Sequence, residues 1–286
     1  MGYNEIIDAV EQAAAENIRI EQGDFYDAET GLLFCGKCYT PKQTRVTIFG
    51  VERTPFCLCR CGAEQRDREE RERRQAERQA RIAEKRRECF PDRELMTCTF
   101  GKDDGANAKI SKICRNYSEK FILFKRDGKG LLLFGTVGTG KTFYAAAVAN
   151  DLIDRGYTCL VTNFTRLVNT IQGMYTGRQE YIDALNGYDL LVIDDLAAER
   201  NTEYMNEIVY SVIDSRNRAG LPLIITTNLT ADELKHPADI NKQRIYSRLF
   251  EMCLPIEVTG TDRRRDALKR DYAAYLNMLN DCKENQ

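Results

Sequence analysis

The chain has 286 residues, of which 43% are hydrophobic, and a formal net charge of −2 at pH 7. This length allows one domain of about 200 residues beside a smaller module, with enough apolar side chains for a packed core. The sequence contains no run near the roughly 18 apolar residues of a membrane span, and its acidic N-terminus is unlike a basic secretory signal. We therefore expect a cytoplasmic protein without membrane contact.

Charge divides the chain into regions that the net charge conceals. Residues 1–34 contain eight acids and a single base, whereas residues 35–63 contain five bases and a single acid. A run of mixed charge follows, and an alternating α/β pattern begins near residue 120. We predict three parts: an N-terminal module over 1–62, a charged helical spacer and linker over 63–118, and the main domain over 119–286.

Five of the eleven cysteines fall within 27 residues of the N-terminal module. Tetrahedral Zn²⁺ needs four ligands, so we predict a structural zinc ribbon. A redox-active C-x-x-C motif is the alternative, but it requires a βαβ context that this segment lacks. Cys35 and Cys38 form the first ligand pair, and Cys57 with either Cys59 or Cys61 completes the site. The ribbon suits docking on another protein, and contact with DNA remains open through Lys37, Lys42, Arg45 and Arg60.

The segment Glu64–Glu88 contains ten basic and eight acidic residues. Pairs four residues apart, such as Glu70 and Arg74, can stabilise a solvated helix, so we predict a helical spacer. DNA binding by its bases is the alternative, although the interleaved acids cancel most of the positive field. Residues 98–118 contain Gly101 and Gly105 and are expected to form a loop-rich linker.

From residue 120 onward, apolar runs alternate with helical patterns. The segment Thr202–Arg218 has apolar side chains on one face at helical spacing. Alternating strands and helices predict an α/β fold, with a parallel sheet covered on both sides. The predicted buried strands are 131–134, 158–161, 190–193, 223–226 and 254–258.

A glycine-rich motif follows the first of these strands. It reads Gly135-Thr136-Val137-Gly138-Thr139-Gly140-Lys141-Thr142, which fits G-x4-G-K-[ST], and an apolar helix begins at Phe143. The glycines let backbone N–H groups surround a phosphate at a helix N-terminus. We predict an ATP site formed by these residues and Phe143, in which Lys141 contacts the β- and γ-phosphates and Thr142 binds Mg²⁺.

Two carboxylates, Asp194 and Asp195, end the strand that begins at Leu190. We predict that Asp194 holds the magnesium shell, whereas Asp195 orients and polarises the water that attacks ATP. The next strand ends at Asn228, which we predict to hydrogen-bond the γ-phosphate or the attacking water. Together these residues indicate ATP hydrolysis.

Taken together, the motifs GTVGTGKT, LLVIDDL, ITTN and Ser247-Arg248-Leu249 resemble the AAA+ helicase loaders of the DnaC and DnaI type and the IstB-like transposition ATPases. The resemblance covers about residues 120–265, and the cysteine-rich leader resembles that of phage or mobile-element members. It implies a P-loop AAA+ core with a reduced lid and with Asn228 as sensor 1. It further implies that Arg248 is an arginine finger for a neighbouring subunit, with Arg244 as the alternative, and that Arg264 contacts the nucleotide.

The function that this resemblance implies is ATP-dependent loading of a replicative helicase onto single-stranded DNA by a homo-oligomer. A helical insertion near Asn163–Gly177 is implied to contact the DNA, although its residues suit an ordinary core and surface equally well. An IstB-like helper that acts on duplex DNA is the alternative. A P-loop small-molecule kinase is a further one, and the set of Asp195, Asn228 and Arg248 argues against it. The residues of the insertion that suit nucleic acid are Phe164, Arg166, Tyr175 and Arg178.

Overall fold

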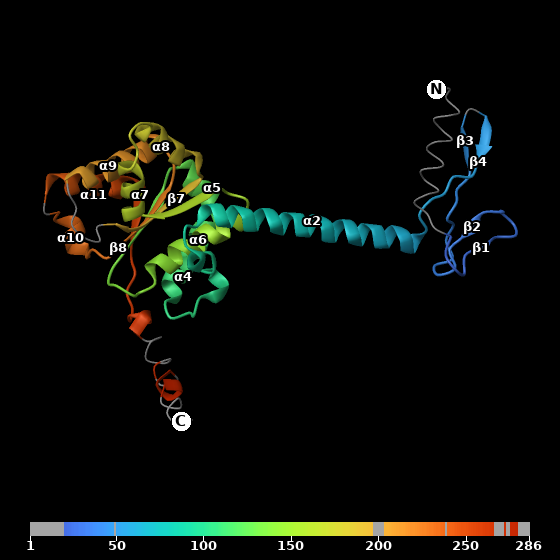
Figure 1. The fold of residues 1–286 in the computed structure, drawn as a ribbon, viewed down its shortest axis with the longest axis horizontal. Coiled ribbons are helices and arrows are strands. Elements are labelled where there is room, and N and C mark those ends of the chain that lie inside the picture. The colour runs from blue at the N-terminus through green and yellow to red at the C-terminus, as the bar shows by residue number, and fades with distance from the viewer. Residues whose placement is uncertain are drawn as a thin grey trace. The chain divides into compact units, whose positions relative to one another are not determined.

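The structure is a computed structural model that describes residues 20–48, 50–196, 203–237, 239–265, 272 and 275–279. Its chain divides into two compact units, Met1–Ala80 and Arg81–Gln286 (Figure 1). Within the described ranges, no helix is both long enough and apolar enough to cross a membrane.

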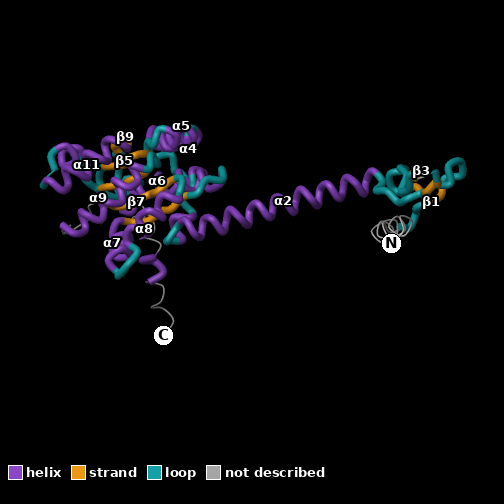
Figure 2. Tube along the Cα trace, turned by 90° about the horizontal axis from the view of Figure 1, so that it is seen from above, coloured by secondary structure: helices purple, strands orange, loops and turns teal. Residues whose placement is uncertain are grey.

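The C-terminal unit is built on a parallel sheet, for which the described residues supply five strands in the order β6-β7-β8-β5-β9. Figure 2 shows these strands between helices that cover both faces. Because both faces are covered, the central strands are mostly buried and apolar, with polar residues toward the carboxyl ends of β7 and β8. The predicted α/β fold is thus confirmed. The strands are β5 (Gly130–Phe134), β6 (Cys159–Asn163), β7 (Leu190–Leu196), β8 (Leu223–Thr227) and β9 (Cys253–Glu257).

Alternate side chains of β5 enter two different hydrophobic cores. Leu131 and Leu133 pack with α4 (Ala108–Glu119), α5 (Phe121–Arg126) and α6 (Lys141–Asp154), whereas Leu132 and Phe134 pack with the helices of the opposite face. This alternation follows from the two-residue period of a strand. The helices of the opposite face are α7 (Phe164–Gln172), α8 (Arg178–Ala184), α9 (Glu203–Arg218), α10 (Ala231–Lys235) and α11 (Ile240–Met252).

The expectation of a loop-rich linker over 98–118 is corrected by helix α4. Its Ile110, Cys114 and Tyr117 are buried against the sheet, and its N-cap is Asn107, whose side chain accepts a hydrogen bond from the Ile110 N–H. These apolar residues recur at i, i+4 and i+7, which is the period of an amphipathic helix. The glycines at the start of the segment indicate a loop, whereas the periodic apolar residues after them indicate a helix. The segment therefore belongs to the core of the C-terminal unit.

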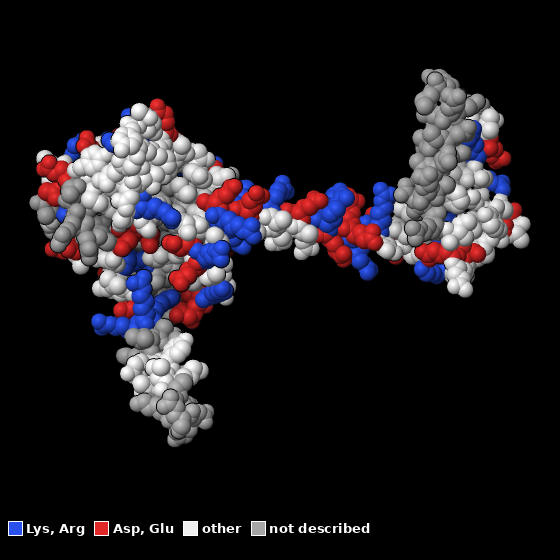
Figure 3. Space-filling model, in the orientation of Figure 1, with Lys and Arg blue, Asp and Glu red and all other residues white. Residues whose placement is uncertain are grey.

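Helix α2 (Arg60–Cys89) confirms the helix expected over Glu64–Glu88. Figure 3 shows acidic and basic side chains interleaved along it, and Arg74 pairs with Glu70 over 2.5 Å, as the spacing predicted. Its last turn is anchored to the C-terminal unit, because Cys89 is buried there and Arg86 binds the Asp154 carboxylate at 2.6 Å. The short helices α3 (Arg93–Met96) and η1 (Phe100–Lys102) follow.

The N-terminal unit contains two small antiparallel ladders. Strand β1 (Phe25–Tyr26) pairs with β2 (Leu33–Phe34), and β3 (Val46–Ile48) pairs with β4 (Val51–Arg53). The buried centre holds Leu33 beside cysteine side chains and a buried ion pair between Lys42 and Asp24. Because residues 20–80 bury few apolar side chains, an additional cross-link would stabilise this part of the chain.

Candidate functional site

The glycine-rich motif forms the loop between β5 and α6. Gly135 has φ +134°, and a Cβ there would lie 2.6 Å from the Val258 carbonyl oxygen, so a side chain would collide with the end of β9. Gly140 has φ +97° and is the N-cap of α6. These two positions require glycine, and they place the loop over the N-terminus of α6, where N–H groups can bind phosphate oxygens.

Lys141 is held inside this loop. Its Nζ donates to the carbonyl oxygens of Gly135 and Thr136 at 2.9 and 2.7 Å. Burial lowers the pKa of Lys141, although the nearby carboxylates of Asp195 and Asp194 oppose this shift. The ammonium group is thus a positioned cation that can exchange carbonyl acceptors for phosphate oxygens.

Asp194 is the hydrogen-bonding centre of the site. Thr142 Oγ1 donates to both of its carboxylate oxygens, at 2.9 and 3.1 Å, and Thr226 Oγ1 donates to Oδ1 at 2.5 Å. Burial raises the pKa of Asp194, while the hydrogen bonds from the two threonines lower it. A hydroxyl and a carboxylate at this distance present the oxygen ligands that Mg²⁺ prefers, so the residues present fit this ion.

Asp195 adopts a left-handed backbone conformation with φ +59°, next to an irregularity in the pairing of β7 with β8. Its N–H donates to Thr226 Oγ1 at 2.9 Å, and its Oδ1 accepts a hydrogen bond from Asn228 Nδ2 at 2.9 Å. Such a conformation is unfavourable for a residue with a side chain, and such residues cluster at functional sites. It turns the exposed carboxylate of Asp195 toward the end of β8.

These residues surround one pocket, which both arginines at positions 263 and 264 also line. Arg264 was predicted there, and Arg263 was not. The Arg263 guanidinium lies 5.7 Å from the Tyr144 ring centroid and 3.3 Å from Asp104 Oδ1, and the backbone N–H of Arg263 donates to the Gly138 carbonyl oxygen. Thr226 was not predicted as a pocket residue either. Two signals in the sequence could have indicated these residues: Arg263 lies in a run of three arginines, and Thr226 is a polar residue within a buried strand. The lining is completed by Val137, Gly138, Gly140, Lys141, Thr142, Phe143, Asp194, Asp195, Thr226 and Asn228.

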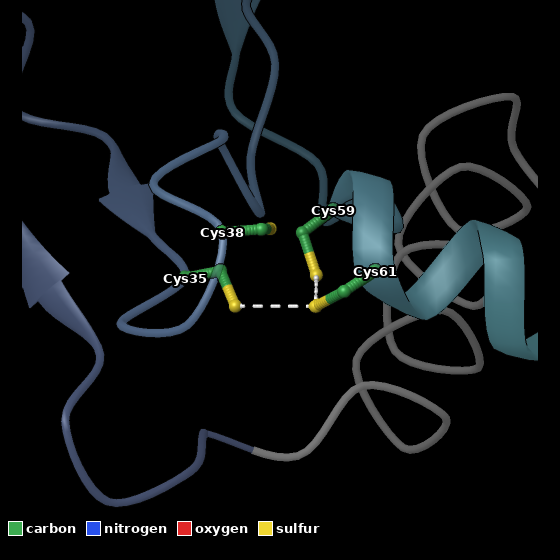
Figure 4. Close-up of side chains that lie close together, drawn as sticks. All are labelled: Cys35, Cys38, Cys59 and Cys61. Atoms are coloured by element: carbon green, nitrogen blue, oxygen red, sulfur yellow. Dashed lines mark hydrogen bonds between the residues drawn. The ribbon is translucent and has the colours of Figure 1, made fainter.

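In the N-terminal unit, four cysteine sulfurs converge within 4.8 Å of one another (Figure 4). Cys61 Sγ lies 3.6 Å from that of Cys35 and 3.4 Å from that of Cys59. Four thiolates at Zn–S distances of about 2.3 Å stand about 3.8 Å apart in a tetrahedron, so Cys35, Cys38, Cys59 and Cys61 fit Zn²⁺. The hydrogen bond with the Thr40 hydroxyl, 3.1 Å from Cys38 Sγ, is the largest of several causes that lower the pKa of Cys38 to about 5, whereas hydrogen bonds with the neighbouring cysteines raise the pKa of Cys61 to about 12.

The structure corrects the predicted place of Cys57 in this site. Cys57 lies outside the group of four, and its sulfur is 3.7 Å from the Pro41 carbonyl oxygen. The reason is the start of α2 at Arg60, which puts Cys61 in the first helical turn, close to Cys59. The second cysteine pair of the group is therefore Cys59 and Cys61.

Comparison with known proteins assigns the chain to a family. The family model described as "IstB-like ATP binding protein" matches residues 63–270. The chain belongs to the IstB-like ATP-binding proteins. The match begins after the cysteine cluster and contains every residue of the nucleotide pocket.

Individual relatives of this IstB-like protein include replicative helicase loaders. The chain is 25% identical to the loader DnaI of Bacillus subtilis over 194 residues, covering 61% of each chain, and 28% identical to the loader DnaC of Escherichia coli K12 over 137 residues, covering 46% of this chain and 54% of DnaC. A crystal structure of DnaI superposes with a TM-score of 0.51 and 27% identity, covering 61% of this chain and 95% of that one. The chain thus spans between half and two thirds of the length of these curated relatives. The fold is that of AAA+ P-loop ATPases.

Arg248, the predicted finger of this IstB-like protein, lies away from its own nucleotide pocket. It belongs to α11, where its guanidinium contacts Glu251 Oε2 at 2.8 Å and Asp214 Oδ1 at 3.3 Å. Arg244, the alternative, stacks on the Tyr210 ring at 4.4 Å. Both arginines are thus held on the α9–α11 surface.

The predicted insertion is helix α7 with the loop after it. Phe164 is 5% exposed and belongs to the core, so its ring is not available to stack on a base, whereas Tyr175 is fully exposed. Arg166 lines a second hollow that reaches Asp194 and Asp195. Of the residues that suit nucleic acid, the two arginines and Tyr175 are therefore accessible.

Proposed function

We propose that this IstB-like protein hydrolyses ATP and uses it to load a replicative helicase onto single-stranded DNA. The observation that carries the proposal is the joint hydrogen bonding of Thr142, Asp194, Asp195 and Asn228 at one edge of the sheet, beside the phosphate loop. Similarity to two curated helicase loaders supplies the partner.

Each residue of the pocket has a chemical role in this proposal. Lys141 stabilises the charge on the β- and γ-phosphates, and Thr142 and Asp194 hold Mg²⁺, which neutralises charge on the phosphate oxygens when it is bound. Asp195 accepts a proton from the attacking water and orients it, while Asn228 fixes the Asp195 carboxylate. Arg264 contacts the nucleotide from the end of the sheet.

Arg248 completes the site of a neighbouring copy of the chain. It contacts neither Lys141 nor Asp195 of its own chain, and α11 presents it on the surface with 38% of its side chain exposed. A guanidinium from the next subunit stabilises the charge that develops on the transferred phosphoryl group. ATP hydrolysis therefore requires a homo-oligomer.

The N-terminal unit holds a structural Zn²⁺ through Cys35, Cys38, Cys59 and Cys61 and binds the helicase. Fixing four thiolates at one point adds stability to a unit whose described residues bury few apolar side chains. The domain plan follows: a zinc-binding module over 1–62, a charged helical spacer along α2, and an ATPase domain that contains α4 as well as residues 119–286.

A complex with the replicative helicase tests this function. Size-exclusion chromatography of the purified chain with its cognate replicative helicase should give a common peak in the presence of ATP and Mg²⁺. The IstB-like match favours a second candidate, a helper that acts on duplex DNA. Hydrolysis that duplex DNA stimulates, without any complex with the helicase, would favour that candidate.

A further inference from the structure

The turn over residues 35–40, which we call the zinc-binding knuckle, contains a residue whose backbone conformation is unfavourable for any side chain. Tyr39, which follows Cys38, has φ +54°, in the left-handed region where glycine is the usual residue. Its N–H donates to the Cys35 carbonyl oxygen at 2.9 Å, so the knuckle fixes this conformation. A tyrosine here destabilises the turn relative to glycine, and such local strain points to a role for the side chain.

The Tyr39 ring faces solvent within a small aromatic surface. Its side chain is 71% exposed, and its ring centroid lies 6.1 Å from that of Phe25, which in turn stacks on Phe34 at 6.0 Å. The three rings form what we call the knuckle surface. Tyr26 lies on the opposite face, because it pairs across the ladder with the buried Leu33 and not with Phe34.

Local charge decides which class of partner this surface suits. An aromatic platform for single-stranded nucleic acid needs cations that follow the backbone. The two lysines that follow Cys35 most closely are engaged by acids, Lys37 by Glu21 at 2.6 Å and Lys42 by Asp24 at 2.5 Å. Four thiolates around one Zn²⁺ add a formal charge of about −2 close by.

The turn between β1 and β2 adds further negative charge. It carries Asp27 and Glu29, against Arg45, which donates to the Thr30 carbonyl oxygen. Residues 20–62 contain five acids and five bases, among them the exposed Arg60 beside Thr40, so the module gains its net negative charge from the zinc-bound thiolates. This balance offers phosphates no excess of cations, whereas a protein surface with basic side chains is attracted. Exposed aromatic side chains of this kind are the typical anchors of protein–protein interfaces.

We propose that Phe25, Phe34 and Tyr39 dock into an apolar pocket of the replicative helicase that is rimmed by basic side chains. This inference rests on the proposed function, since that function supplies the partner. Tyr39 is the main anchor because it is the most exposed of the three rings, and the zinc-bound knuckle holds it in an orientation that an unstrained residue would not keep.

Substitution of Tyr39 by glycine distinguishes a role of the side chain in helicase binding from a role in the folding of the module. Glycine is the best residue for φ +54°, so full-length Tyr39→Gly should keep its zinc and melt at a temperature no lower than the wild type. Its affinity for the purified cognate helicase should nevertheless fall at least about tenfold. Phe25→Ala should weaken binding similarly, whereas the matched control Tyr26→Ala should stay within about twofold.

Each contrary outcome has a distinct meaning. If Tyr39→Gly binds the helicase with wild-type affinity, the inference is wrong but the proposed function is unaffected. Loss of zinc in that variant has the same consequence, because Tyr39 would then have a structural role. Weaker binding to an oligothymidine strand with unchanged helicase binding would assign the surface to nucleic acid instead. A wild-type chain that does not bind the helicase contradicts the proposed function and overturns both.

Discussion

The Thr226 hydroxyl donates a hydrogen bond of 2.5 Å to Asp194 Oδ1, and Thr226 Oγ1 also accepts a hydrogen bond from the Asp195 N–H at 2.9 Å. One buried threonine on β8 thereby positions two consecutive carboxylates of β7. A hydrogen bond to a charged group contributes about 1.5–3 kcal/mol, so its loss should change hydrolysis measurably.

The variant Thr226→Val keeps the shape of the side chain and removes the hydroxyl. We expect kcat for ATP hydrolysis to fall by roughly 10- to 100-fold, with the affinity for ATP nearly unchanged, because the phosphate loop is intact. Thr226→Ser should restore most of the rate. If the valine variant hydrolyses ATP at the wild-type rate, Thr226 does not position the carboxylates.

Asp195→Asn should separate binding from hydrolysis. The amide oxygen can still accept the hydrogen bond from Asn228, but it cannot take a proton from water, so we expect normal ATP affinity and a loss of at least about 100-fold in kcat. Isothermal titration with ATP and a steady-state assay of phosphate release measure the two quantities. Equal loss of both would place Asp195 in the metal shell.

The cysteine cluster predicts which thiols hold zinc. Protein purified without chelators should contain about one zinc ion per chain, and Cys61→Ser should lose it. Cys57→Ser is the matched control and should retain zinc, because Cys57 lies outside the group of four. Zinc removal should leave ATP binding intact, since the pocket lies in the other unit. A chain without zinc, or zinc lost only with Cys57, would contradict the assignment.

Arg248 can be tested by mixing inactive variants. Arg248→Ala keeps an intact nucleotide site, and Lys141→Ala keeps an intact finger, so each alone should lose at least about 100-fold in hydrolysis, whereas co-assembled mixtures should recover activity. Arg244→Ala, one turn earlier on the same helix, is the control that should keep its activity. Co-assembled mixtures without recovery would show that Arg248 acts only within its own chain.

Much of this fold could be predicted because its strands are short, buried and apolar, and because the phosphate loop is a continuous motif. Features that depend on contacts between segments far apart in the sequence could not be predicted. The role of Thr226 depends on the register of β8 against β7, and the exclusion of Cys57 depends on where α2 begins. Helix α4 was missed for a different reason, since its apolar period follows two glycines that indicate a loop.

The most direct test of the account is the amount of replicative helicase retained on circular single-stranded DNA. Purified helicase, ATP and Mg²⁺ are incubated with the DNA in the presence or absence of the chain, and bound helicase is quantified after removal of free protein. The account predicts that the wild-type chain increases the bound helicase several-fold, and that Lys141→Ala, which lacks the positioned cation of the phosphate loop, does not. An equal increase with Lys141→Ala, or none with a wild-type chain that binds ATP, would contradict ATP-dependent helicase loading.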